Sequence, residues 1–271
     1  MEGYCVDALI LDVDGVVWLE GTLIEENIQV IRRAYDEGIP VVFLTNNATR
    51  SRRVYSLLLS EAIGRRISVE QVVNSAYSAA EWLRRTRGPS KVLVVGEEGL
   101  VEELVLAGHT PLSTTEWRHA DTVVVGLDRN ITYHKLSAAH KALTRRNAFF
   151  LITNRDPAYP VTGGTIPGAG AIVSFLETST GRKADFNAGK PELGILDLAL
   201  ERAGRPRNPV MVGDRVEIDM DMARKAGIPG LLVLTGVTKE PPSDTDGFIV
   251  AHSLSDAVER GLLRFCPTPS S

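Results

Sequence analysis

Short apolar runs alternate with longer amphipathic stretches along the whole chain. Eight runs are rich in valine, isoleucine and leucine, which is typical of strands that are buried on both faces. Nine stretches between or after these runs have apolar residues at helical spacing. Strands are predicted at residues 8–11, 41–44, 92–95, 122–125, 149–152, 210–212, 231–234 and 248–250, and helices at 25–36, 53–62, 76–85, 99–106, 134–145, 169–177, 192–203, 219–226 and 255–263. The alternation predicts an α/β fold with parallel sheets covered by helices on both faces.

Two polar segments interrupt this pattern. Residues 154–170, NRDPAYPVTGGTIPGAG, are dense in proline and glycine, so we expect a long loop shaped by turns. Residues 239–247, KEPPSDTDG, predict a second polar loop. The strand, loop, strand and helix between residues 231 and 263 are expected to continue the same sheet.

Composition narrows the class of protein. The 271 residues are 44% hydrophobic and 24% charged, which is ordinary for a soluble globular protein with a sizeable core. The net charge is −4 and the basic pairs are scattered, so we expect no nucleic-acid partner. No apolar run approaches membrane-spanning length and the N-terminal region carries early acids, which predicts a cytoplasmic protein without a membrane partner.

The two cysteines, Cys5 and Cys266, stand near opposite ends of the chain. They can pair only if the two ends meet. A disulfide framework is excluded by this count, and a reducing cytosol is the default expectation.

Polar residues follow several of the predicted strands. Asp12 and Asp14 follow the first strand, Thr45 and Asn46 the second, and Asp214 the strand at 210–212. Each group alone is explained by an ordinary turn or a helix cap. Because ligands of parallel α/β sheets bind beyond the carboxyl ends of the strands, the groups together predict one site.

The acidic residues of this site favour a metal ion. Carboxylates clustered without histidine or cysteine suit a hard, oxygen-seeking cation, most naturally Mg²⁺. Such a cation would offset the repulsion between Asp12, Asp14 and Asp214. Mg²⁺ commonly shares its remaining positions with a substrate phosphate, so a phosphate is the expected partner.

Donors for that phosphate stand nearby in the predicted topology. Thr45 offers a hydroxyl, Asn46 an amide, and Lys190, in NAGKPE directly before a helix that Pro191 can start, an ammonium group. The turn at Gly15 adds backbone N–H groups. One of the two paired aspartates can then attack phosphorus, and the other can protonate the leaving oxygen and later accept a proton from water.

Four motifs resemble the haloacid dehalogenase superfamily of aspartate-nucleophile phosphatases: LILDVDGVVW, VVFLTNNATRS, NAGKPE and VMVGDRVEIDMDMARKAG. Their form is similar to the branch with NagD-type nucleotidases, 4-nitrophenyl phosphatases, and phosphoglycolate and pyridoxal phosphatases. The resemblance implies a doubly wound, parallel-sheet Rossmann-like core with an inserted α/β cap domain. The core would comprise residues 1–75 and 185–271, and the cap residues 76–184.

The resemblance also implies roles for individual residues. Asp12 would be the nucleophile, and Asp14 the general acid and base with its backbone carbonyl on Mg²⁺. Thr45 would hold phosphate oxygens with help from the Asn46 amide. Lys190 would pair with both Asp12 and the phosphate, and so stabilise charge in the transition state.

For the metal, the resemblance implies that Asp214 is a direct ligand and that Asp219 supports the ion through water. Asp221 competes for the second role, and the spacing leaves the choice open.

The predicted cap departs from its relatives at one place. Relatives usually have TNPD where this chain has Thr153-Asn154-Arg155-Asp156. Asn154 and Asp156 are candidates for substrate contact. Arg155 covers the surface or, if it points inward, favours an anionic leaving group. The cap loops would close over the leaving group, and two chains could pair through the cap.

Rival functions are weighed against this one. Phosphoryl transfer to an acceptor other than water shares the same intermediate. A metal-free dehalogenase is disfavoured by Asp14 and Asp214. Residues 92–99, VLVVGEEG, raise the alternative of a non-catalytic nucleotide-binding module, but they lack the full glycine pattern and suit a strand followed by a helix. The natural substrate stays open among nucleotides, phosphoglycolate, pyridoxal phosphate and sugar phosphates.

Overall fold

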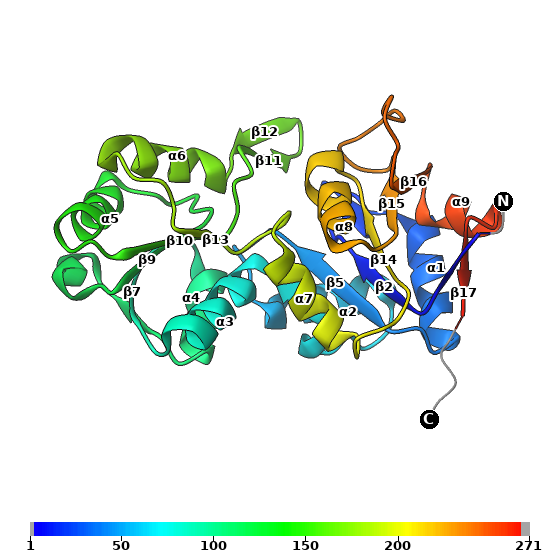
Figure 1. Ribbon diagram of the computed structural model, residues 1–271, viewed down its shortest axis with the longest axis horizontal. Helices are drawn as coiled ribbons and strands as arrows, with labels where there is room; N and C mark the ends of the chain where they lie inside the picture. Colours follow the sequence, from blue (N-terminus) through cyan, green and yellow to red (C-terminus); the bar gives the residue numbers. More distant parts are fainter. Residues whose placement is uncertain (1–2, 267–271) are drawn as a thin grey trace. The chain divides into compact units, whose positions relative to one another are not determined.

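The protein folds into two compact units, which a computed structural model describes from residue 3 to residue 266 (Figure 1). The first unit contains the chain up to Thr45, residues Tyr55–Val73 and the chain from Leu196 onward. The second contains Asn46–Val54 and Asn74–Ile195, so the segment expected as a cap, 76–184, lies within it. Each unit is built around its own parallel sheet.

The sheet of the first unit has six strands in the order β16-β15-β14-β2-β5-β6. Their bounds are Ala8–Leu11 for β2, Val41–Thr45 for β5, Val72–Asn74 for β6, Pro209–Gly213 for β14, Gly230–Val233 for β15 and Phe248–Ala251 for β16. Strand β2 runs parallel to both β14 and β5, with Leu11 opposite Val212 on one side and Phe43 on the other. The carboxyl ends of these three strands therefore lie at the same edge of the sheet.

Helices cover this sheet because its strands are apolar on both faces. All four residues of β2 are fully buried. Leu9, Leu11 and Phe43 join one core cluster with apolar residues of α1, α2 and α9. Among the residues that the structure describes, the α-helices lying wholly or partly in this unit are α1 (Glu25–Asp36), α2 (Arg52–Ile63), α7 (Leu193–Arg202), α8 (Asp221–Ala226) and α9 (Leu254–Glu259). A π-helical turn, Val216–Met220, precedes α8 and contacts β14 and β15.

The sheet of the second unit has five strands in the order β13-β10-β9-β7-β8. Their bounds are Lys91–Val95 for β7, Thr110–Leu112 for β8, Thr122–Val125 for β9, Phe149–Ile152 for β10 and Phe186–Asn187 for β13. Successive residues of β9 enter different cores: Val123 packs with helices α5 (Tyr133–Arg145) and α6 (Ala169–Thr180), and Val124 with α3 (Ser75–Arg87) and α4 (Glu98–Leu106). Figure 1 shows α6 and α3 on opposite sides of these strands. This sheet is therefore covered on both faces.

All eight predicted strands and nine predicted helices occur within the described residues, with ends shifted by a few positions. One shift concerns Pro191: its peptide bond with Lys190 is cis, and α7 begins only at Leu193. Short elements had no sequence signal strong enough to predict them. These are β1 (Tyr4–Val6), β3 (Trp18–Leu19), β4 (Thr22–Leu23), β6, β8, β13, β17 (Leu263–Phe265) and the 3₁₀ turns Val69–Gln71 and Thr114–His119.

One predicted loop was wrong, and one predicted helix was too long at its C-terminal end. The expected loop at 154–170 contains an antiparallel hairpin of β11 (Ala158–Val161) and β12 (Gly164–Pro167). A two-stranded ribbon has free edges that tolerate Pro160, and Gly163, at φ 83°, allows the tight turn. The helix expected at 255–263 ends at Glu259, because Gly261, at φ 69°, turns the chain into β17.

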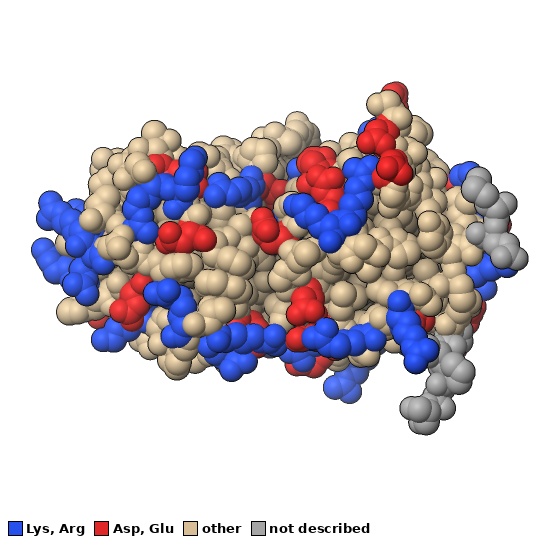
Figure 2. All heavy atoms as spheres, viewed as in Figure 1, with Lys and Arg blue, Asp and Glu red and all other residues tan. Residues whose placement is uncertain are grey.

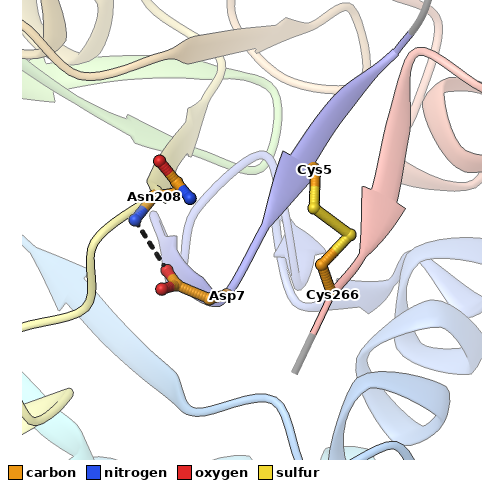
Figure 3. Close-up of a disulfide and its surroundings, with 4 residues drawn as sticks. All are labelled: Cys5, Asp7, Asn208 and Cys266. Atoms are coloured by element: carbon orange, nitrogen blue, oxygen red, sulfur yellow. Dashed lines mark hydrogen bonds between the residues drawn. A yellow bond between two sulfur atoms is a disulfide. The ribbon is translucent and has the colours of Figure 1, made fainter. Parts of the chain in front are cut away.

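The two ends of the described chain lie side by side. Strand β1 pairs in parallel with β17, and a disulfide joins Cys5 to Cys266 with the Cα atoms 5.6 Å apart (Figure 3). Asp7 follows β1, and its carboxylate accepts hydrogen bonds from the N–H groups of Arg207 and Asn208, each at 2.9 Å. The condition for pairing the two cysteines is therefore met. Since disulfides are rare in a reducing cytosol, the cysteines no longer argue for that compartment.

The surface and the helices bear on the expected partners. On the face drawn in Figure 2, lysine and arginine side chains are interspersed with aspartate and glutamate. Among residues 3–266, no helix has the length and apolar character needed to cross a membrane.

The disulfide predicts a measurable contribution to stability. Replacing both cysteines, Cys5→Ser with Cys266→Ser, should lower the free energy of unfolding by ~2–4 kcal/mol, because a cross-link that closes most of the chain restricts the unfolded state. Denaturant unfolding of the oxidised protein and the variant measures the difference. Reductant should shift the unfolding midpoint of the wild type and leave that of the variant unchanged. Equal midpoints for the oxidised wild type and the variant would contradict the prediction.

Candidate active site

Three carboxylates meet at the carboxyl edge of the sheet in the first unit. Asp12 follows β2, Asp214 follows the neighbouring strand β14, and Asp219 lies in the π-helical turn Val216–Met220. Each offers one carboxylate oxygen, and these oxygens lie within 4.8 Å of one another. The three residues are 7%, 2% and 0% exposed, respectively. The adjacent strand ends explain why two of the aspartates lie together.

Main-chain N–H groups orient all three carboxylates. Val13 donates to Asp12 Oδ1 at 2.7 Å, and Val237 donates to Asp214 Oδ2 at 2.5 Å. Arg215 donates its N–H to Asp219 Oδ2 at 3.2 Å. Each of these hydrogen bonds fixes the direction of one carboxylate oxygen.

Gly15 is required by the close approach of Asp214. Its φ is +84°, and a Cβ at this position would lie 2.4 Å from Asp214 Oδ2. The hydroxyl of Thr235 also donates to the carbonyl oxygen of Gly15 at 2.5 Å. The turn after Asp14 can therefore lie against the metal-binding candidates only with glycine at this position.

Asp14 lies beside the three-carboxylate cluster rather than in it. Its Oδ1 accepts a hydrogen bond from the indole N–H of Trp18 at 3.0 Å, and its backbone forms an isolated bridge with Trp18. Asp14 is partly buried, whereas Asp12 is buried. The two carboxylates thus have different surroundings, as separate roles in acid–base and nucleophilic chemistry require.

The donor chemistry of the cluster fits a divalent cation. Asp12, Asp214 and Asp219 offer oxygen only, which suits a hard ion rather than one that prefers nitrogen or sulfur. Buried like charges at this separation repel one another, and a bound cation removes that cost. Asp221 does not join them: its side chain is 41% exposed and lies 3.5 Å from Arg224. The choice left open by the spacing thus favours Asp219.

Thr45 is the last residue of β5, next to β2 in the sheet. It is buried, with 2% exposure. The residues that follow β14, β2 and β5 are therefore brought to one edge, as the sequence pattern predicts for a parallel sheet.

The other predicted phosphate-binding and substrate-binding residues belong to the second unit, where they form one hydrogen-bonded group. Asn46, Asn154 and Lys190 are buried, at 9%, 5% and 2% exposure. The Asn46 side chain bonds the backbone of Lys190 and the carboxylate of Asp156, and the Asn154 side chain bonds the backbone of Asn46.

Arg155, at the position where the family resemblance leads one to expect proline, contacts α6. Its Nη2 lies 3.0 Å from Oε1 of Glu177, and its side chain is 48% exposed. Burial acts to raise the pKa of Glu177, but the Ala184 N–H, Arg155 and Lys183 together lower it to about 2. Arg155 thus covers the surface of the second unit as the partner of a charged glutamate.

The segment suggested as a nucleotide-binding turn is a strand followed by a helix, β7 and α4. A cavity of about 710 Å³ lies at its end. Its cations are occupied: Arg129 binds Glu97 at 2.7 Å and Lys135 binds Asp128 at 2.7 Å. This lining gives no support to a phosphate-binding module.

Residues of the segment after β15, and Trp18, contact the site although no sequence motif singled them out. Thr235 and Val237 bond the Gly15 turn and Asp214, and Trp18 bonds Asp14. The signal was present in part, because the strand predicted at 231–234 is followed by Thr235-Gly236, the same kind of polar strand end that revealed the other sites.

Comparison with known proteins places these features in a family. The chain matches the family model for haloacid dehalogenase-like hydrolases over residues 9–110 and a further HAD hydrolase-like model over residues 187–257. It is similar to phosphoglycolate phosphatase 2 of Arabidopsis thaliana, with 36% identity over 256 residues that cover 87% of this chain and 85% of the relative.

Solved structures agree. The p-nitrophenyl phosphatase from Archaeoglobus fulgidus superposes with a TM-score of 0.83 at 32% identity, covering 94% of this chain and 99% of that chain. The glycerol phosphate phosphatase from Mycobacterium tuberculosis, solved in complex with calcium, has a TM-score of 0.82 at 33% identity, covering 92% of this chain and 74% of that chain.

These matches confirm the predicted fold class and branch. All three proteins are named as phosphatases, and the two solved structures share the fold of this chain. The chain therefore belongs to the haloacid dehalogenase-like hydrolases, as one of the phosphatases of that family.

Proposed function

We propose that this phosphatase hydrolyses monoesters of small phosphorylated metabolites through a phosphoaspartate on Asp12, with Mg²⁺ as its cofactor. The observation that carries the proposal is the buried cluster of Asp12, Asp214 and Asp219 at the carboxyl edge of a parallel sheet. An all-oxygen cluster in such a position suits a divalent cation and a phosphate together.

Asp12 and Asp14 have different roles in the reaction: Asp12 is the nucleophile, and Asp14 is the general acid and base. A carboxylate oxygen of Asp12 attacks phosphorus, and the bond from phosphorus to the ester oxygen breaks. Asp14 gives its proton to the leaving oxygen. Asp14 then takes a proton from a water molecule whose oxygen attacks phosphorus; the bond from phosphorus to Asp12 breaks, inorganic phosphate leaves, and Asp12 returns as a carboxylate and Asp14 as a protonated acid. The hydrogen bond from Trp18 to Asp14 supports an orientation distinct from that of Asp12.

Carboxylate oxygens of Asp12 and Asp214 and the main-chain carbonyl of Asp14 would hold Mg²⁺, with Asp219 supporting it through water. When bound, the ion supplies positive charge that offsets the charge of the phosphate and the carboxylates. The N–H donors on Asp12, Asp214 and Asp219 keep these carboxylates oriented for that purpose.

Thr45 and the main chain around Asn46 and Gly15 would donate hydrogen bonds to phosphate oxygens, and Lys190 would stabilise the charge that develops in the transition state. Asn46 and Lys190 come from the second compact unit. Their assignment to the same phosphate therefore rests on the family motifs that contain them. Asn154 and Asp156 stay candidates for contact with the leaving group.

The substrate class follows from the relatives, which are named for phosphoglycolate, p-nitrophenyl phosphate and glycerol phosphate. Small phosphomonoesters are common to all three. The expected cap at 76–184, pairing of two chains through it, and a cytoplasmic location stay predictions of the sequence.

The metal requirement is tested with p-nitrophenyl phosphate as the probe substrate. Turnover should depend on added Mg²⁺, disappear with EDTA and return when Mg²⁺ exceeds the chelator, because the three carboxylates need a cation to bind a phosphate dianion. Release of p-nitrophenol measures the rate. Undiminished turnover in EDTA, or none with Mg²⁺, would reject the proposed mechanism.

Loss of the nucleophile should abolish the reaction. We expect Asp12→Asn to lower kcat by more than ~10⁴-fold, because an amide does not form the covalent intermediate. Rapid acid quench with ³²P-labelled substrate should trap labelled protein for the wild type and none for the variant. Circular dichroism checks that the variant is folded. Labelled protein or wild-type turnover in a folded Asp12→Asn variant would remove Asp12 from the proposed role.

Asp219 and Asp221 form a matched pair for testing the metal support. Asp219→Asn should raise the Mg²⁺ concentration for half-maximal turnover by ~10–100-fold, because the loss of an outer-sphere partner weakens metal binding. Asp221→Asn should change it by less than about twofold, as expected for a mostly exposed surface residue. Mg²⁺ titration of the rate measures both. The reverse ranking would assign the support to Asp221.

A further inference from the structure

The chain that leads to Lys190 is tied to the sheet of the second unit. Strand β13 pairs with β10, with Asn187 opposite Ile152. The N–H of Ala188 then donates to the carbonyl of Ile152 at 2.9 Å, and the hydroxyl of Ser78 donates to the carbonyl of Ala188 at 2.7 Å. Hydrogen bonds therefore fix the main chain as far as Ala188, two residues before Lys190.

Because Gly189 has no side chain, the main chain at this residue lies very close to Thr153 and Asn46. A Cβ there would lie 2.2 Å from the carbonyl oxygen of Thr153 and 2.7 Å from Oδ1 of Asn46. A larger residue would push the chain away from both. The glycine before Lys190 thus brings the lysine's main chain into hydrogen-bonding distance of the Asn46 side chain.

Both polar groups of the Asn46 side chain are engaged within the protein. Its Oδ1 accepts from the N–H of Lys190 at 2.7 Å, and its Nδ2 donates to the carbonyl of the same lysine at 3.2 Å. The Nδ2 also donates to Oδ2 of Asp156 at 3.1 Å. One amide side chain therefore hydrogen-bonds both the N–H and the carbonyl of Lys190.

Asn46 is itself held in place through its main chain. Its carbonyl accepts from the hydroxyl of Ser75 at 2.6 Å and from Nδ2 of Asn154 at 2.9 Å. The Oδ1 of Asn154 accepts from the N–H of Asp156 at 3.1 Å. The hydrogen bonds therefore connect Asn154, Asn46 and Lys190 in series, with Asp156 joining the first two.

We propose that Asn46 is a positioning residue that fixes Lys190, and that its side chain is not a ligand of the phosphate. This inference rests on the proposed function, because it takes Lys190 as the residue that acts on the phosphate. Any help that Asn46 gives the phosphate directly comes from its backbone N–H. Asn154 contributes indirectly to the position of Lys190, because its side chain bonds the carbonyl of Asn46.

The alternative, a side-chain contact from Asn46 to phosphate, would break bonds that the structure makes. Turning the amide toward a ligand would leave the buried N–H and carbonyl of Lys190 without these partners. A group already satisfied on both its oxygen and its nitrogen is better suited to hold a neighbour than to bind substrate. A shift of about 1 Å in a catalytic group can cost ~10²-fold in rate, so such a hold matters.

Amide hydrogen exchange tests the contact without any need for activity. In Asn46→Ala the N–H of Lys190 should exchange about tenfold faster than in the wild type, because its acceptor is lost. The matched control is Asn47→Ala. Asn47 bonds the hydroxyl of Tyr159 at 3.0 Å and the N–H of Thr49 at 2.9 Å, so exchange at Lys190 should stay at the wild-type rate. Unchanged exchange in Asn46→Ala would overturn the inference.

A double-mutant cycle tests the consequence for catalysis. Asn46→Ala should lower kcat for p-nitrophenyl phosphate by ~10²-fold when Lys190 is present. In the Lys190→Ala background the same change should cost less than about twofold, since there is no lysine to position. Equal losses in both backgrounds would assign Asn46 an independent contact with substrate and overturn the inference.

Inhibition by inorganic phosphate gives a second measure of the same cycle. Its inhibition constant should rise with Asn46→Ala only when Lys190 is present, whereas a side-chain ligand would raise it in both backgrounds. Should Asn46→Ala not fold, Asn46→Ser carries the same predictions, because its hydroxyl is too short to bond both sides of Lys190. An inactive wild type would defeat the proposed function, and the exchange experiment would still decide whether Asn46 holds Lys190.

Discussion

Repulsion among buried carboxylates is the constraint on which this structure depends. Asp12, Asp214 and Asp219 have oxygens within 4.8 Å of one another and almost no exposure to water. Such a group is stable only with compensating positive charge, which N–H donors supply in part and a divalent ion would supply in full. The oxygen-only donor set at this edge of the sheet is therefore suited to a divalent cation.

The parallel sheet makes this crowding unavoidable. Strands β14, β2 and β5 lie side by side and end at one edge, so the residues that follow them are neighbours whatever their distance in the chain. The Gly15 turn completes the site, since any side chain there would collide with Asp214. Outside this edge the same strands are apolar on both faces and serve only to bury the sheet beneath its helices.

In the second unit, hydrogen bonds hold the main chain of the buried Lys190. Gly189 allows the close approach, and the side chain of Asn46 bonds the lysine's N–H and carbonyl. Asparagine is suited to this task because it offers an acceptor and a donor on one short, rigid group. A network of this kind is most valuable when every member is satisfied, which explains how polar residues so thoroughly buried can be stable.

The sequence by itself determined the alternation of strands and helices, the family, and the acids of the site, because apolar periodicity and strand-end motifs are local features of the chain. It also placed Asp12, Thr45 and Asp214 at strand ends that proved to be neighbours in one sheet. Only the tertiary structure placed Asp219, and not Asp221, with Asp12 and Asp214, joined Cys5 to Cys266 and gave Asn46 its partners in Lys190 and Asp156. Each of those outcomes is a contact whose direction is set by packing between distant segments, and no local pattern of residues encodes it.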